Sequence, residues 1–318
     1  MVAAVLVTAL VGLTAGVVLL GRDDPSSPSA PALSGEPIDY VALGDSYSAG
    51  PLIPLLRNDA SGCFRSTNNY AAYVAGLLGV ATYRDATCSG ASTEDLRGRQ
   101  AVMLSSKRPR PQLASLSPET DLVTIGIGGN DFGLFGSIAG ECGAAVSREL
   151  GAPCRTRYAD AAGRDTKARD ARRIRGNVEA ALADVRARAP EADVYVVGYP
   201  RLLPETGTCG AAGFTRADAS WARWVAGLLN SSLRGAAEAV GATYVDLYPA
   251  TRGHDICAGP DAWVNGRTIR FDRALSFHPF QEGMAGVARI VFETVTGQDA
   301  PEITGDAAPP ADAVIRSR

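Results

Sequence analysis

Five short apolar runs that alternate with helical segments place the strongest constraint on how this 318-residue chain can fold. The runs span residues 38–43, 81–87, 121–127, 193–197 and 242–247. Helical spacing of apolar residues predicts helices at 69–78, 167–189, 216–240 and 280–295. Strands that are apolar on both faces are typical of parallel sheets covered by helices on both sides. The sequence therefore predicts one α/β domain with a central parallel sheet, over residues 38–297.

Small and polar residues follow three of these predicted strands. They are Gly44-Asp45-Ser46, Ser89-Gly90 and Gly129-Asn130. Because the carboxyl ends of parallel strands lie along one edge of a sheet, these turns should converge although they are far apart in the sequence. Glycine at a strand exit also allows the backbone to approach a ligand closely. We therefore expect the functional site at this edge.

Ser46 has the position of a catalytic nucleophile in this arrangement. Ester hydrolysis by a serine also requires a base, a group that orients the base, and donors for the oxyanion. The side-chain amide of Asn130 is a neutral donor suited to the last task. Each motif has an ordinary interpretation too, since Gly-Asp-Ser occurs in turns and helix N-caps and asparagine is a common turn residue. Of the two histidines, His254 and His278, the second is favoured as the base because Pro279 can fix it just before the last helix.

The N-terminal region predicts an exported protein. Residues 2–20 are apolar without a single charge, and their length approaches that needed to span a bilayer. No basic residue precedes them, so both a cleaved signal and an uncleaved membrane anchor remain open. Residues 21–37 are rich in Pro, Ser and Ala and are predicted to form a flexible linker. The polar, proline-containing segment 298–318 is predicted to be a disordered tail.

Six cysteines support an extracellular location, because disulfides persist outside the cytosol. Many pairings are conceivable, and pairing in sequence order is the simplest hypothesis. The resulting pairs are Cys63–Cys88, Cys142–Cys154 and Cys209–Cys257. The sequence has no Cys-x-x-Cys pair and few histidines, which argues against a zinc site, and no metal or other cofactor is expected. A net charge of −3 gives no reason to expect nucleic-acid binding.

Four motifs together resemble those of the SGNH hydrolases, also called GDSL lipases/esterases. In the family's order, the matching segments are Gly44-Asp45-Ser46-Tyr47-Ser48, Ser89-Gly90-Ala91, Gly129-Asn130-Asp131 and His278-Pro279. The six cysteines and Gly198-Tyr199-Pro200 are similar to the secreted actinobacterial esterase branch. The resemblance implies a flavodoxin-like three-layer α/β/α sandwich. It also implies Ser46 as nucleophile and His278 as base, with Ser46 N–H, Gly90 N–H and the Asn130 amide as oxyanion donors.

One position departs from the family's usual pattern. The family commonly has Asp three residues before the histidine, where this chain has Leu275. In similar secreted members a backbone carbonyl replaces the carboxylate, so we expect the carbonyl of Leu275, or one beside it, to accept the proton on His278 Nδ1. Asp272 and Asp255 are alternative partners. The expected machinery is a Ser-His dyad, because a carbonyl fixes the tautomer but stabilises the imidazolium less than a carboxylate does.

These features predict a secreted or membrane-anchored serine esterase or lipase that forms an acyl-enzyme on Ser46. Its substrate is expected to be a small-molecule or lipid ester, and the enzyme is expected to be a monomer. An acyltransferase, or a deacetylase of cell-envelope glycan or glycolipid, would use the same site. A non-catalytic carbohydrate- or lipid-binding module is disfavoured because Ser46 and His278 are both present. Apolar residues after the third motif are predicted either to line an acyl pocket or to pack in the core, namely Phe132, Leu134, Phe135 and Ile138.

Overall fold

Five parallel strands form the centre of the computed structural model, which describes residues 37–57, 62–102, 105–106, 108–143 and 153–307. The strands are β1 (Asp39–Gly44), β2 (Thr82–Asp85), β3 (Leu122–Gly126), β4 (Asp193–Val197) and β5 (Thr243–Val245). Their order in the sheet is β2-β1-β3-β4-β5, and every neighbouring pair is parallel. This order is that of flavodoxin-like sheets, so the predicted fold class is confirmed.

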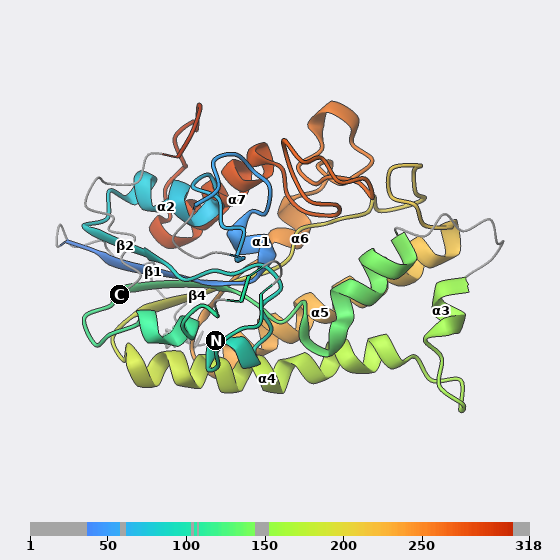
Figure 1. The fold of residues 1–318 in the computed structure, drawn as a ribbon, viewed down its shortest axis with the longest axis horizontal. Coiled ribbons are helices and arrows are strands. Elements are labelled where there is room, and N and C mark those ends of the chain that lie inside the picture. The colour runs from blue at the N-terminus through green and yellow to red at the C-terminus, as the bar shows by residue number, and fades with distance from the viewer. Residues whose placement is uncertain (1–36, 58–61, 103–104, 107, 144–152, 308–318) are drawn as a thin grey trace, which may run out of the picture.

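Long helices cover both faces of the sheet (Figure 1). On one face lie α2 (Tyr70–Leu78) and α7 (Gln281–Thr296), and on the other lie α4 (Thr166–Arg188) and α5 (Arg216–Ala239). Shorter α-helices are α1 (Ser46–Ala49), α3 (Pro153–Arg157) and α6 (Leu247–Ala250). Single turns of 3-10 helix occur at Glu94–Leu96, Gln112–Ser115, Asp131–Gly133 and Gly259–Asp261, and a π-helix spans Gly136–Gly143.

Side chains of the central strand β1 alternate between two apolar layers. Val41 and Leu43 pack in the cluster that contains the buried faces of α4 and α5. Tyr40 and Ala42 pack in the cluster formed with α2 and α7. Since successive strand residues point to opposite faces, burial on both sides explains why this run is apolar throughout.

Short polar side chains begin the long helices, and glycines end two of them. Asn69 accepts a hydrogen bond from the amide of Ala72 at the start of α2 (2.9 Å). Asp165 does the same for the amide of Ala168 at the start of α4 (2.8 Å). Gly79 and Gly297 adopt left-handed conformations after α2 and α7. These are the caps expected at helix ends, and they fix where each helix turns back to the sheet.

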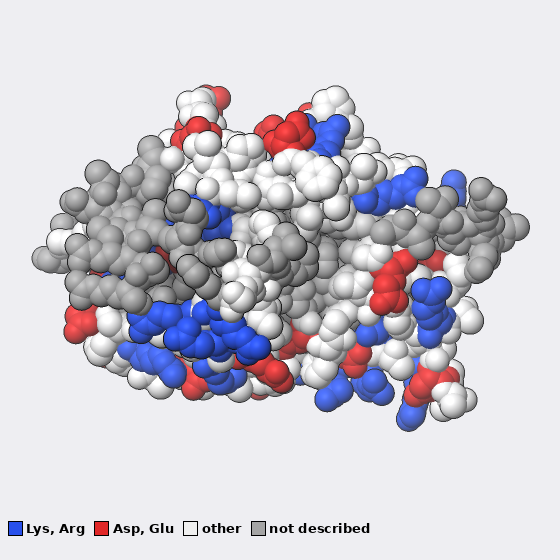
Figure 2. Space-filling view, viewed as in Figure 1, with Lys and Arg blue, Asp and Glu red and all other residues white. Residues whose placement is uncertain are grey.

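The exposed face of α4 carries many basic side chains, and acidic neighbours pair with several of them (Figure 2). Arg175 pairs with Glu179 at 2.7 Å, one helical turn further along. Arg188 lies 3.7 Å from Asp184. Exposed pairs of this kind contribute at most about 1 kcal/mol each, so we interpret this surface as a solvated, basic helix face in which part of the charge is paired.

All three predicted disulfides are present, Cys63–Cys88, Cys142–Cys154 and Cys209–Cys257. The prediction of a disordered tail is wrong for its first part, because the chain packs against α2 as far as residue 307. The hydroxyl of Tyr73 donates to the carbonyl of Gly305 (3.0 Å), and Asn68 Nδ2 donates to the carboxylate of Asp306 (2.9 Å). The apolar segment 2–20 and the rest of the tail lie outside the described residues. Within the described ranges, no helix combines the length and apolarity needed to cross a bilayer.

Candidate active site

The first three motifs meet at the carboxyl edge of the sheet. Ser46 follows β1 and Asn130 follows β3, and these strands are neighbours, with Gly44 opposite Gly126. Gly90 follows β2, on the other side of β1. In a sheet of this order the connections from β1 and β3 leave toward opposite faces, which opens a crevice between their ends. The three motifs therefore surround one crevice, as the strand pattern predicted.

Ser46 and His278 are in direct contact in this crevice. The serine Oγ lies 2.8 Å from the histidine Nε2, although the two residues are far apart in the sequence. Both are largely buried, with 6% and 5% of their surface exposed. Ser46 is the first residue of α1, and Asp45 caps this helix by accepting a hydrogen bond from the amide of Tyr47 (2.9 Å). The short helix thus fixes the serine at the end of β1.

A backbone carbonyl orients the imidazole, but it belongs to Ser276 rather than Leu275. His278 Nδ1 lies 2.7 Å from the Ser276 oxygen. The carbonyl of Leu275 instead accepts hydrogen bonds from Asn265 Nδ2 (3.0 Å) and from the backbone amide of His278 (3.2 Å). The expectation named the carbonyl of Leu275 or one beside it, and in the structure the neighbouring carbonyl, that of Ser276, has this contact. Between Ser276 and His278 lies Phe277, whose positive φ of 59° turns the chain so that the Ser276 carbonyl comes within hydrogen-bond distance of Nδ1.

The other polar candidates near the histidine have different environments. Asp255 accepts a hydrogen bond from the amide of Cys257 (2.8 Å), and Asp272 is exposed. The second histidine, His254, lies in another part of the fold, where its Nδ1 contacts the carbonyl of Asp261 (2.8 Å) and its ring stacks on Trp263. Of the two histidines, the structure therefore brings His278 to the serine.

The surroundings of His278 favour the neutral imidazole. Burial lowers its pKa from 6.5 to about 4, against a smaller opposing effect of the hydrogen bond to Ser276. The rings of Tyr47 and Phe135 lie 5.2 and 5.4 Å from the imidazole, centroid to centroid. The hydroxyl of Tyr47 also donates to the carbonyl of Phe277, which holds the residue next to the histidine. A neutral, fixed imidazole is suited to accept a proton from Ser46.

The second motif forms a tight turn beside the crevice. Gly90 has a φ of 79°, which favours glycine, and it is exposed. The amides of Ser89 and Ala91, on either side of it, donate to the carbonyls of Cys63 (3.0 Å) and Cys88 (3.1 Å). Since these cysteines form a disulfide, the covalent link and the turn support each other.

The third motif is bound to the second through two side chains. Asn130 Nδ2 donates to the carbonyl of Ala91 (3.0 Å). The buried carboxylate of Asp131 accepts hydrogen bonds from the amide (2.9 Å) and the hydroxyl (2.7 Å) of Thr93. It also accepts one from Asn177 of α4 (2.8 Å). Sequence reasoning assigned no role to Asp131, which here sets the spacing between the two predicted oxyanion donors.

Tyr199 connects the first motif with the third. Its hydroxyl donates to the carboxylate of Asp45 (2.5 Å) and accepts a hydrogen bond from the amide of Gly129 (2.7 Å). A Cβ atom at Gly129 would lie 2.7 Å from this hydroxyl, so the contact requires glycine there. Burial raises the pKa of Asp45 from 3.8 to about 7, although the hydrogen bonds from Tyr199 and Tyr47 oppose the shift. Tyr199 follows β4, and its place at the same sheet edge is the signal that could have identified it.

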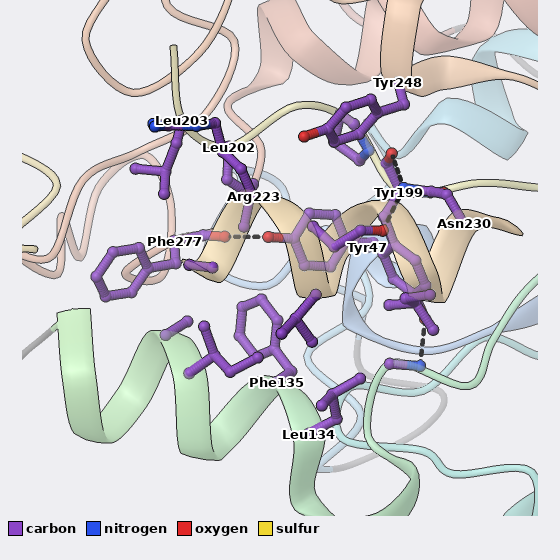
Figure 3. Close-up of a pocket in the computed structure, with 18 of the residues that line it drawn as sticks. Tyr47, Leu134, Phe135, Tyr199, Leu202, Leu203, Arg223, Asn230, Tyr248 and Phe277 are labelled. Atoms are coloured by element: carbon purple, nitrogen blue, oxygen red, sulfur yellow. Dashed lines mark hydrogen bonds between the residues drawn. The ribbon is translucent and has the colours of Figure 1, made fainter. Parts of the chain in front are cut away.

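An apolar pocket adjoins the dyad, with an empty volume of about 750 Å³ that includes open solvent at its mouth (Figure 3). Ser46 and His278 do not line it, but Tyr47 and Phe135 do, and their rings lie beside the imidazole of His278. Of the residues after the third motif, Leu134, Phe135 and Ile138 line the pocket. Phe132 does not; it is partly exposed, with the guanidinium of Arg173 over its ring at 4.4 Å.

Comparisons with known proteins find lipases and related acylhydrolases. The model of the "GDSL-like Lipase/Acylhydrolase family" matches residues 42–285. Lipase 2 of Streptomyces coelicolor is 38% identical over 259 residues, which cover 78% of this chain and 83% of that protein. The crystal structure of phospholipase A1 from Streptomyces albidoflavus has 30% identity and a TM-score of 0.65, covering 82% of this chain and 99% of that one. The extracellular lipase of Streptomyces rimosus has 27% identity and a TM-score of 0.61, covering 81% and 99%.

Proposed function

The chain belongs to the GDSL-like lipase/acylhydrolase family, a family of carboxylic ester hydrolases, and we propose that Ser46 is its nucleophile and His278 its general base. The observation that carries the proposal is the 2.8 Å contact between Ser46 Oγ and His278 Nε2 in a buried crevice. This contact is the geometry that a hydroxyl needs to lose its proton as it attacks.

The acylation step follows from the protonation state of the dyad. Because the pKa of His278 is lowered to about 4, the imidazole is neutral near pH 7. Its Nδ1–H donates to the Ser276 carbonyl, which leaves the lone pair of Nε2 directed at the serine. Oγ attacks the acyl carbon as Nε2 takes the hydroxyl proton. The tetrahedral intermediate then collapses, and the alcohol leaves with the proton from Nε2.

Deacylation repeats the same transfers with water. His278 takes a proton from a water molecule that attacks the acyl-enzyme carbonyl, and it returns that proton to Ser46 Oγ as the carboxylic acid leaves. The Ser276 carbonyl stabilises the transient imidazolium only through its dipole, whereas the carboxylate of a triad would do so with a full negative charge. The protein therefore depends more heavily on the oxyanion donors than a triad enzyme does.

Three donors are proposed for the oxyanion, namely the amides of Ser46 and Gly90 and the side chain of Asn130. The Asn130 amide has two N–H groups, and only one is needed for its bond to Ala91. The second is available to the intermediate. The Thr93–Asp131 bonds support this arrangement, because they hold the Gly90 and Asn130 turns at a fixed separation.

The apolar pocket supports an alkyl or fatty acyl ester as the substrate class. A lining that includes Leu134, Phe135 and Ile138 would bury a chain of methylene groups, each worth about 0.8 kcal/mol. An acetyl group would leave most of this surface unused, which favours a lipase or esterase over a glycan deacetylase. The three disulfides and the extracellular lipase of Streptomyces rimosus support export of this chain as well.

A chain-length series of p-nitrophenyl esters tests the proposal. Wild type should show a burst of nitrophenol and a preference for chains longer than acetyl, and Ser46→Ala should lose both while keeping the fold. Asp255→Asn and Asp272→Asn should retain nearly full kcat if the Ser276 carbonyl alone orients His278. Full activity of a folded Ser46→Ala variant would refute the assignment. Adding an acceptor alcohol separates hydrolysis from acyl transfer, since a transferase would form the new ester in preference to the acid.

A further inference from the structure

Two loops beside the dyad expose large apolar side chains. The loop after α1 presents Leu55 and Leu56, which are 62% and 45% exposed. The loop before α7 presents Ile269 and Phe271, which are 41% and 81% exposed. We call these four side chains the rim patch. Four of the six exposed large apolar side chains among the described residues lie on these two loops, and such a concentration is a mark of an interaction site.

The two loops are joined to each other and to the dyad. The amide of Leu275 donates to the carbonyl of Pro51 (3.2 Å), and Figure 1 shows the blue loop after α1 next to the orange loop before α7. The first loop directly follows the helix that begins at Ser46, and the second ends just before His278. The rim patch therefore belongs to the same region of the surface as the catalytic crevice.

Backbone hydrogen bonds keep both loops in place. The carbonyl of Leu55 accepts from the amide (2.9 Å) and the hydroxyl (3.1 Å) of Thr67. In the second loop, Asn265 Nδ2 donates to the carbonyls of Thr268 (2.8 Å) and Ala274 (3.2 Å). The apolar side chains are thus held outward by a fixed backbone, which is costly in water unless another apolar phase covers them.

Positive charge is interleaved with the apolar side chains of the second loop. Residues 267–273 contain three arginines and one aspartate, a local charge of +2 (3 − 1) on a chain whose net charge is −3. The guanidinium groups of Arg270 and Arg273 lie over the ring of Phe280, at 5.8 and 4.4 Å. Arg273 also pairs with Glu282, whereas no ion pair is found for Arg270 within the described residues.

We propose that the rim patch docks onto a lipid surface with anionic headgroups. The apolar tips would enter the boundary between headgroups and acyl chains, and the arginines would lie at the level of the phosphates. The positive charge of the second loop, next to its exposed apolar side chains, favours an anionic lipid surface as the partner. The inference rests on the proposed function, because it places the ester substrate in a lipid interface and brings the mouth of the crevice to it.

Tryptophan fluorescence of the full-length chain tests docking at one position. The fluorescence of the added tryptophan in Phe271→Trp is obtained by subtracting the wild-type emission. This fluorescence should shift to the blue when the protein is mixed with phosphatidylglycerol vesicles. Brominated acyl chains should quench at least about half of it, since side chains docked in this way lie roughly 5–10 Å deep. The matched control is Arg289→Trp, at an exposed position of α7, where quenching should be absent. Each tryptophan reports only the depth of its own position. Attachment of the protein to vesicles through residues 2–20 would therefore not quench the tryptophan at position 271.

A second set of measurements tests whether docking requires anionic lipid and positive charge on the protein. Phosphatidylcholine vesicles, 0.5 M salt and the double variant Phe271→Trp/Arg270→Gln should each reduce the quenching at position 271 severalfold. Equal quenching on neutral and anionic vesicles, or none on either, would overturn the proposal. The proposal would also be overturned if the rim patch binds a second copy of the chain. That result would appear as a dimer that the Phe271→Ser substitution converts to a monomer. Hydrolysis of monomeric p-nitrophenyl butyrate, measured in parallel, reports the proposed function separately from docking.

Discussion

The hydroxyl of Tyr199 donates a hydrogen bond to the carboxylate of Asp45, the residue before Ser46, over 2.5 Å. Asp45 caps the helix that carries Ser46, and the same tyrosine oxygen accepts the amide proton of Gly129, next to Asn130. One buried side chain from the end of β4 thus contacts both the nucleophile turn and the turn of a proposed oxyanion donor. It positions catalytic groups without touching the reacting atoms.

Removing this hydroxyl should reduce both stability and turnover. Tyr199→Phe leaves the Gly129 amide and the Asp45 carboxylate each short of a partner, which costs about 1–3 kcal/mol for each buried group. We expect kcat to fall about tenfold, with little change in KM, because the lost bonds position groups that act in the transition state. Tyr158→Phe, which removes a hydroxyl bonded to exposed Glu141, is the control and should change neither. An unchanged kcat in Tyr199→Phe would show that the link has no positioning role.

Asp45 should make the stability of the protein depend on pH. Burial raises its folded-state pKa from 3.8 to about 7, so the folded protein binds this proton more tightly than the unfolded chain. The stability from this group is therefore fully present below pH 3.8 and is lost as the pH rises through about 7. Asp45→Asn cannot titrate. The difference in free energy of unfolding between wild type and Asp45→Asn, measured with denaturant at pH 4 to 8, should move in favour of the variant as the pH rises.

The acid limb of the activity profile should reflect the lowered pKa of His278. The base must be neutral, and burial lowers its pKa to about 4, so kcat/KM should stay high until the pH approaches 4. A p-nitrophenyl ester followed over a pH series at constant ionic strength provides the measurement. A limb near 6.5, the ordinary pKa of histidine, would contradict it. If kcat/KM instead falls as the pH drops through about 7, and this fall is absent in Asp45→Asn, the titrating group is the carboxyl of Asp45.

The elements that the sequence could predict are those encoded by local patterns. The strand ending at Gly44 and the helix over 167–189 carry their own periodicity and ends, and both occur in the structure with small shifts at the boundaries. Three of the motifs could be placed at one sheet edge because parallel strands have their carboxyl ends together. The choice of His278 over His254 depended on the proline that follows it and on the resemblance to the family.

The residues that sequence reasoning missed depend on tertiary packing. The carbonyl that contacts His278 Nδ1 belongs to Ser276, next to Phe277 with its positive φ, and no pattern in Ser276-Phe277-His278 indicates that conformation. Likewise, Tyr199 can reach Asp45 only because β4 lies beside β3 in the sheet, an order set by how helices pack on the two faces. The extra order after residue 297 depends on contacts with Asn68 and Tyr73, far away in the sequence.

Asn130 provides a direct test of the oxyanion site. If its amide donates to the tetrahedral intermediate, Asn130→Ala should lower kcat by about 10²–10³-fold and leave KM nearly unchanged. Asn177→Ala is the matched control, because Asn177 donates to the neighbouring Asp131 and has no proposed contact with substrate. Its effect on kcat should be less than about tenfold. Equal losses in the two variants would indicate that Asn130 acts only by holding the turn.

The disulfide at the second motif should matter for turnover as well as for stability. Cys63–Cys88 closes 25 residues and Cys209–Cys257 closes 48, so chain entropy predicts losses of about 3.5 and about 4 kcal/mol when each is replaced by serines. Only the first pair supplies carbonyls to the amides that flank Gly90. Cys63→Ser/Cys88→Ser should therefore lower kcat severalfold at a temperature where it remains folded, whereas Cys209→Ser/Cys257→Ser should not. Denaturant unfolding and ester hydrolysis under the same conditions would separate the two effects. Equal kcat values for the two variants would show that the turn at Gly90 keeps its geometry without the covalent link.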